Sequence, residues 1–192
     1  RFPNPQLVYA LGRAMGHSGD VQAIRALVSR IDGADPGGNS WQGQGVAEEV
    51  VKTRIANHLF TTPLMIAGPV ALPELAKGLG AKSETTRRVC AYVLSQSYVN
   101  REPIPNDTPE FRADLIKALN GKDHFVQFWI FEAVSRQQIA EAEPVLISLV
   151  EKREAGLGVR IRAMTALSWF KSDRAFEAAL KALDDPDYLI RI

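Results

Sequence analysis

The chain has 192 residues, of which 46% are hydrophobic and 23% are charged, and its 23 basic and 22 acidic residues give a net charge of +1. This is ordinary globular usage, so we expect a sizeable buried core and find no block of charge suited to nucleic acid or an anionic membrane surface. A single cysteine excludes an internal disulfide, and no apolar run reaches the about 20 residues of a membrane-spanning helix.

The first third of the chain predicts helices with irregular connections. Residues 6–15 have the pattern of the second helix of a helical pair, residues 20–31 that of a first helix, and residues 45–60 that of another second helix. The glycine-rich loop between the last two contains Trp41. A tryptophan in such a loop either folds back onto the protein or is held out for a partner, so Trp41 is a candidate partner-binding residue.

Two motifs recur along the rest of the chain at steps of 31 to 40 residues. The first is an apolar pair followed, after two residues, by another apolar residue, and it begins at residues 75, 115, 146 and 179. The second has apolar positions at i, i+4, i+7 and i+8, which form one stripe of an α-helix, and it begins at residues 86, 126, 159 and 190. Turn formers and N-cap acids lie between them at 120–123 and 184–187. The repeated unit is therefore predicted to be helix, turn and helix.

The second motif and the turn before it resemble a known family. Asp185-Pro186 followed by Ile190-Arg191, and Val159-Arg160 followed by Ala163, Ala166 and Leu167, resemble HEAT repeats of the bacterial bilin-lyase type. The resemblance implies an all-α, right-handed α-solenoid of stacked helical hairpins, as a single domain over residues 1–192. Its repeats would be divergent over 1–69 and regular over 70–192. A rival interpretation as ankyrin repeats rests on residues 19–36 and 62–64, which do not recur at a steady step.

The sequence contains no recognisable group of catalytic or metal-binding residues. His17, His58 and His124 lie far apart, with no His-x-x-x-His pair and no cysteine cluster. Cys90 falls in the apolar stripe, which predicts a small buried hydrophobe in preference to a nucleophile. We therefore predict no catalytic residue, no cofactor and no metal site.

A basic position recurs one residue into the second motif. It is occupied by Arg87, Arg160 and Arg191, with Gln127 in the remaining unit. Such a row of arginines suits either phosphate contacts along a groove or a structural ladder. In the family that the chain resembles, this arginine commonly pairs with turn acids of neighbouring units, which favours the ladder.

The side of the second helices opposite the apolar stripe is the predicted binding face, which the resemblance makes concave. Its candidate contact residues are Arg88, Tyr92, Phe128, Glu132 and Ile161, with Ser95, Ser135 and Ser168 beside them. The alternative is that these side chains pack between neighbouring helices.

Two classes of function remain open at this level. The first is a noncatalytic scaffold that binds a protein or peptide through this face and Trp41. The second, implied by the resemblance, is an enzyme or enzyme subunit, bilin-lyase-like or DNA-glycosylase-like, that holds a pigment or a duplex. A neutral, apolar face would favour a peptide, and a strongly basic one DNA.

The end of the sequence opens a second helix at residues 185–192 that has only its first turn. The preceding helix, residues 175–183, would then lack its partner, and we expect Leu180 and Leu183 to be poorly covered. This pattern predicts an internal piece of a longer repeat array.

Overall fold

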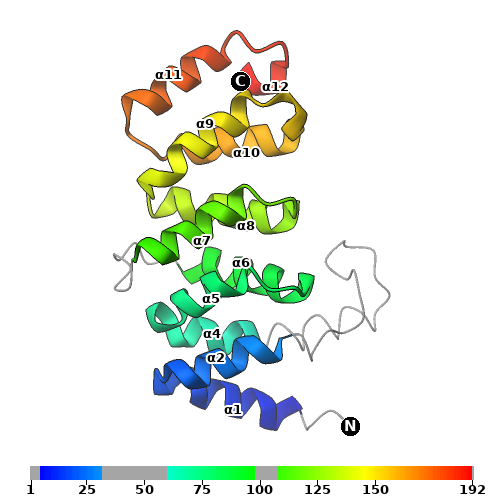
Figure 1. The fold of residues 1–192 in the computed structure, drawn as a ribbon, viewed down its shortest axis with the longest axis vertical. Coiled ribbons are helices and arrows are strands. Elements are labelled where there is room, and N and C mark those ends of the chain that lie inside the picture. The colour runs from blue at the N-terminus through cyan, green and yellow to red at the C-terminus, as the bar shows by residue number, and fades with distance from the viewer. Residues whose placement is uncertain (1–4, 32–59, 98–107, 192) are drawn as a thin grey trace.

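The computed structural model describes residues 5–31, 60–97 and 108–191. Within these ranges the regular structure is helical and no β-strand occurs. The helices lie one above another in chain order along the longest axis of the molecule (Figure 1). The predicted all-α class is therefore confirmed for this part of the chain.

From residue 72 onward the helices come in pairs. The pairs are α5 (Leu72–Gly78) with α6 (Glu84–Ser97), α7 (Pro109–Leu119) with α8 (His124–Arg136), α9 (Glu143–Glu151) with α10 (Leu157–Leu167), and α11 (Asp173–Ala182) with the single turn of α12 (Tyr188–Arg191). Short 3-10 turns at Ala140–Ala142 and Arg153–Ala155 precede α9 and α10. Each pair holds one copy of each recurring motif, so the predicted helix, turn and helix are present.

The N-terminal helices are α1 (Pro5–Ser18) and α2 (Val21–Arg30), and α4 (Thr62–Ala67) leads through the 3-10 turn Gly68–Ala71 into α5. Helix α1 packs against α4, and α2 packs against α5. The helices predicted over residues 6–15 and 20–31 are therefore present. Trp41, and nearly all of the helix predicted over residues 45–60, lie outside the described residues.

The helix pairs form two layers with the core between them. In one layer α6 packs against α8, α8 against α10 and α10 against α12, while in the other α2 packs against α5, α5 against α7 and α9 against α11. Because each pair turns its apolar stripes inward, fully buried leucines and isoleucines follow one another along the stack. They include Leu75, Leu94, Leu115, Leu119, Ile130, Leu146 and Leu167. This arrangement sets α6, α8 and α10 side by side in one layer.

Side chains in the turns start several helices, and Asp123 lies in a predicted turn. Asp123 caps α8, where its Oδ1 accepts hydrogen bonds from the backbone N–H of Phe125 at 3.1 Å and of Val126 at 3.3 Å. Thr108 and Ser172 cap α7 and α11 in the same way. A cap satisfies amide groups that have no partner inside the helix, so these turns fix where each helix begins.

Helices α5 and α6 approach closely at Gly78. A Cβ atom at this position would lie 2.4 Å from Sγ of Cys90, well inside van der Waals contact. Cys90 itself is fully buried, as its place in the apolar stripe predicts. A glycine is thus needed here for packing.

Candidate functional site

The outer side of α6 and α8 carries a cluster of aromatic rings around Trp129. The centroid of the Trp129 ring system lies 4.6 Å from that of Phe128, 5.0 Å from that of Tyr92 and 6.1 Å from that of Phe125, each in an edge-to-face arrangement. All of these side chains are half-buried. Edge-to-face contacts of this kind stabilise one another, so the rings hold a fixed shape.

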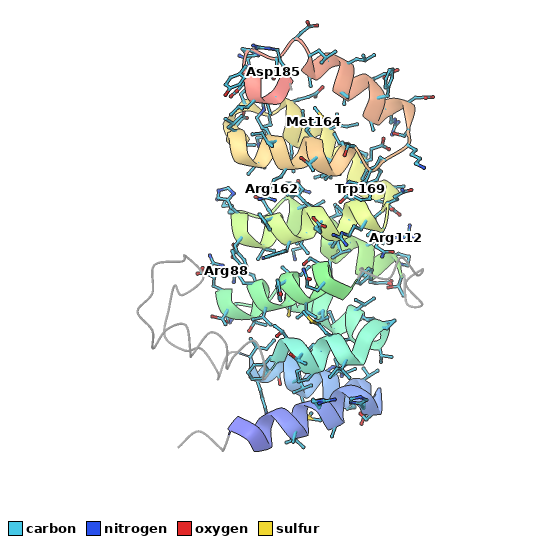
Figure 2. The ribbon with its side chains drawn as sticks, turned by 180° about the vertical axis from the view of Figure 1, so that it is seen from behind. Arg88, Arg112, Arg162, Met164, Trp169 and Asp185 are labelled. Atoms are coloured by element: carbon cyan, nitrogen blue, oxygen red, sulfur yellow. The ribbon has the colours of Figure 1, made fainter. Side chains whose placement is uncertain are left out.

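Two arginines lie over the rings at opposite ends of the cluster. The guanidinium carbon of Arg88 is 5.1 Å from the centre of the Phe125 ring, and that of Arg162 is 3.4 Å from the centre of the Phe128 ring. Figure 2 shows the two arginines on α6 and α10, with α8 between them. We call Arg88, Tyr92, Phe125, Phe128, Trp129 and Arg162 the aromatic cluster.

Acidic side chains accompany both arginines. Arg88 pairs with Glu84 one turn before it, and its Nε lies 3.6 Å from Oδ2 of Asp123. Burial lowers the pKa of Arg162, and the charge of Glu132 opposes that change. The Glu132 carboxylate itself pairs with Arg136. The cluster is therefore an apolar surface with arginines and acids interspersed around it, and it is not a strongly basic one.

A shallow hollow continues the cluster toward the start of α10. It is lined by His124, Phe128, Phe131, Ala155, Gly156, Gly158, Val159 and Arg162. Glycines on the α10 side keep that wall low, because neither Gly156, the N-cap residue, nor Gly158 has a side chain, and the place where a Cβ would stand is open at both. The hollow gives a backbone segment room to approach the Phe128 ring.

The predicted binding residues are brought together in part. Arg88, Tyr92 and Phe128 belong to the cluster, and Glu132 lies beside it near Arg162. Each of these four side chains contacts or faces the next helix of the layer, so part of its surface packs between neighbouring helix pairs. Ile161 is half-buried on α10.

The small serines behave differently from the prediction. Ser95 and Ser135 are 1% and 3% exposed, and their hydroxyls donate to backbone carbonyls of their own helices. The expectation that they line the open face is wrong, because α6 and α8 have neighbours on both sides and the covered surface is wider than the apolar stripe. Only Ser168, on α10, is exposed.

Phe125, Trp129 and Arg162 are the members of the cluster that the predicted set lacks. In the structure Phe125 and Trp129 contact α6 through Arg88 and Tyr92. Arg162 follows Ile161 directly, and only the relative rotation of α8 and α10 sets it over Phe128. The run of aromatic residues Phe125, Phe128, Trp129 and Phe131 is the sequence signal that could have added Phe125 and Trp129 to that set.

The recurring arginines form the structural ladder predicted for them. Nε of Arg160 donates to the backbone oxygen of Val150 at 2.7 Å, and its guanidinium pairs with Asp185 in the next turn. The hydrogen bond from Arg160, followed by the one from the backbone N–H of Asp187, lowers the pKa of Asp185.

The other positions of the ladder make similar contacts. Arg87 donates to the backbone oxygens of Ala81 and Lys82 in the turn before it, at 3.0 and 2.8 Å, and lies 3.5 Å from Asp123 in the next turn. Gln127 is neutral; its Nε2 donates to the backbone oxygens of Leu119 at 2.7 Å and Gly121 at 2.9 Å, and its Oε1 lies 3.0 Å from Nδ1 of His124. Arg191 donates to the backbone oxygen of Asp185 in the turn before it. Arg87 and Arg160 thus join neighbouring helix pairs, whereas Gln127 and Arg191 make contacts within their own units.

No protein-family model matches this chain, and no curated protein matches it either. In the part of the chain that the structure describes, no group of three or more His, Cys, Asp or Glu side chains is placed to hold a metal ion. None of the described helices has the length and apolar composition that a membrane crossing requires. The aromatic cluster is thus the best-formed candidate site on the described surface.

Proposed function

We propose that this protein is a noncatalytic interaction module that binds a protein or peptide through the outer side of α6, α8 and α10. The observation that carries the proposal is the aromatic cluster, in which half-buried rings lie between two arginines. Aromatic and arginine side chains contribute most of the free energy at many protein interfaces, because they bury a large area with few rotatable bonds.

The cluster is already organised for binding. Its rings brace one another, and each arginine lies over a ring, so a partner would have few side chains to immobilise. The indole N–H of Trp129 has no hydrogen-bond partner among the described residues.

The charges favour a peptide over a nucleic acid. Duplex binding needs several cations that are free to contact phosphates. Here Arg88 pairs with Glu84, and Arg162 lies near Glu132. The net charge of +1 for the whole chain is consistent with this choice.

We also propose that the helix pairs form a right-handed, HEAT-like α-solenoid with the cluster on its concave side. The recurring motifs and the chain-order packing of the two layers support this arrangement. A concave surface would let an extended or helical segment contact α6, α8 and α10 at once.

Peptides selected from a random displayed library against the full chain provide the test. The Phe128→Ala variant should bind a selected peptide at least about tenfold more weakly, because it removes the ring between Trp129 and Arg162. Phe176→Ala is the matched control, since Phe176 is a 64% exposed ring on α11. It should bind as the wild type does.

Thermal unfolding of Phe128→Ala shows whether its loss of binding reflects unfolding. Arg162→Glu reverses an exposed charge over the same ring and should weaken the same peptide without a change in helix content. If Phe128→Ala and Arg162→Glu both bind like the wild type, or if only Phe176→Ala loses binding, the aromatic cluster is not the site.

A further inference from the structure

The junction between α8 and α10 differs from the junctions on either side of it. Arg87 lies 3.5 Å from Asp123 across the junction of α6 with α8, and Arg160 pairs with Asp185 across the junction that follows α10. Between α8 and the turn before α10, the neutral Gln127 stands at the arginine position, and its amide donates within its own unit. Among the described residues, this junction therefore lacks the arginine–aspartate pair of the other two, and the shallow hollow opens here.

The hollow is small and largely apolar, and no acidic side chain of the described residues lines it. Its volume is about 340 Å³, which is at the small end of the range for ligand pockets. Gly156 is the N-cap residue of α10, the place that Asp123 takes in α8, and the first turn of α10 contains no acidic residue. Arg153 and Glu154 are exposed in the turn before it, but neither lines the hollow.

The position of the hollow is inside the stack. Its lining comes from α8, from α10 and from the turn before α10. Helix α8 also packs against α6, and α10 also packs against α12, so both helices have further neighbours in their layer.

Arg162 carries the one permanent charge among the described residues that line the hollow, and His124 is the other titratable group there. The guanidinium carbon lies 3.4 Å from the centre of the Phe128 ring, and the group makes no hydrogen bond or ion pair with the described residues. The charge of Glu132 acts on it, but the Glu132 carboxylate is paired with Arg136. An arginine stacked on a ring keeps its N–H groups free at the edge of its plane, where two of them can donate to one carboxylate.

We propose that this hollow binds an aspartate or glutamate side chain of the partner, whose carboxylate pairs with Arg162 while a neighbouring apolar side chain of the same peptide lies against the Phe128 ring. The inference rests on the proposed function and names a residue that the bound peptide must carry. Burial lowers the pKa of Arg162, so its charge is partly desolvated, and a carboxylate would supply the hydrogen-bond partner that this charge lacks among the described residues. The open places at Gly156 and Gly158 leave room for the peptide backbone beside both contacts.

A single arginine matches a carboxylate better than a phosphate group. A phosphorylated side chain carries close to two negative charges at neutral pH and is typically recognised by a cluster of arginines. The other arginine of the aromatic cluster, Arg88, lies over Phe125 at the opposite end and pairs with Glu84. The hollow therefore offers charge for one carboxylate.

Changes in the peptide test the inference on the full wild-type chain. Peptides from the displayed library that lose binding to Phe128→Ala should carry an aspartate or glutamate next to an apolar residue. In labelled synthetic copies, replacing this acid by its amide should weaken binding about fivefold in fluorescence anisotropy, and added salt should reduce the difference. Replacing the acid by lysine should weaken binding further, because like charges would then meet at Arg162.

A charge reversal in the protein locates the contact. Arg162→Glu should bind the lysine peptide more tightly than the acidic one, which reverses the preference of the wild type. Arg174→Glu is the matched control, because it makes the same change in net charge at an exposed site on α11, and it should still prefer the acidic peptide. Both arginines are exposed, so unfolding temperatures near that of the wild type are expected. The amide substitution in the peptide needs no protein variant, so it tests the inference independently of the stability of Arg162→Glu.

Failure of this inference differs from failure of the proposed function. Peptides that require Phe128 but bind equally well with the acid or its amide would overturn the inference and leave the interaction site in place. A phosphoserine peptide that bound more than about tenfold more tightly than its glutamate counterpart would identify phosphate as the ligand and overturn the choice of a carboxylate. If no selected peptide depends on Phe128, the proposed function fails and this inference fails with it.

Discussion

Protonation of Glu74 should weaken the attachment of α2 to α5. The Glu74 carboxylate accepts hydrogen bonds from Nε and Nη2 of Arg25 at 3.0 and 2.9 Å and from Nζ of Lys77 at 2.9 Å. The Glu74 side chain is 9% exposed. Its hydrogen bond with Arg25, against the opposing effect of burial and with further help from Lys77, lowers the pKa of Glu74 from 4.5 to about 2.

Because folding lowers the pKa of Glu74, the free energy of unfolding should fall as the pH falls. The folded protein holds the Glu74 carboxylate ionised below the pH at which the unfolded chain protonates it. The stabilisation is therefore fully present above about pH 5 and is lost as the pH falls toward 2. A pKa change of this size corresponds to roughly 3 kcal/mol. Because the Arg25 side chain is 52% exposed, solvent screens the pair, and we expect about 1–2 kcal/mol.

Urea unfolding of the wild type and of Glu74→Gln between about pH 7 and pH 3 measures this contribution. The difference in unfolding free energy should be about 1–2 kcal/mol at neutral pH and should shrink steadily below about pH 4.5. Glu110→Gln, at an exposed carboxylate on α7, is the control and should change little at any pH. A difference that stayed constant with pH would refute the reasoning, since it would reflect shape and not charge.

Asp123→Ala should lower the free energy of unfolding by about 1 kcal/mol through loss of the α8 cap. Asp123→Asn should lower it by less, because an amide oxygen still accepts the hydrogen bonds. Equal losses for the two variants in urea unfolding would contradict a capping role. Gly78→Ala should cost roughly 1–3 kcal/mol by crowding Cys90, and calorimetry should show most of the loss restored when Cys90→Ala is added. A Gly78→Ala protein as stable as the wild type would show that the helices can shift apart. Duplex DNA should not bind measurably at physiological salt, and tight binding that falls steeply with salt in fluorescence anisotropy would reverse our choice of partner.

The recurring motifs were enough to predict where the helix pairs lie. The stripe that begins at Val126 falls inside α8, and the acid three residues earlier, Asp123, caps that helix. The buried state of Cys90 followed from the same register, whereas the ladder contacts of Arg160 were expected from the family resemblance. These features depend on local spacing within one unit or on its repetition, and a single sequence contains both.

The candidate site was harder to predict because it depends on how neighbouring helices are rotated against one another. Helical spacing places Ser95 opposite the apolar stripe, but it does not say how far the adjoining helices reach around α6. The contact of Arg162 with Phe128 joins two units, and its geometry is set by the packing between α8 and α10. The periodicity of one helix contains neither piece of information.

The chain-order packing of the layers also bears on how this protein folds. From α5 to α11, each helix contacts helices that are near to it in the sequence, and contacts of this kind form quickly. Arg25 and Glu74 are separated by 49 residues, so joining α2 to α5 requires closure of a much longer stretch of chain. We expect α5 to α11 to assemble first and α1 and α2 to dock afterwards. In hydrogen exchange, the amides of α2 should therefore open more readily than those of α8, whose neighbours lie on both sides.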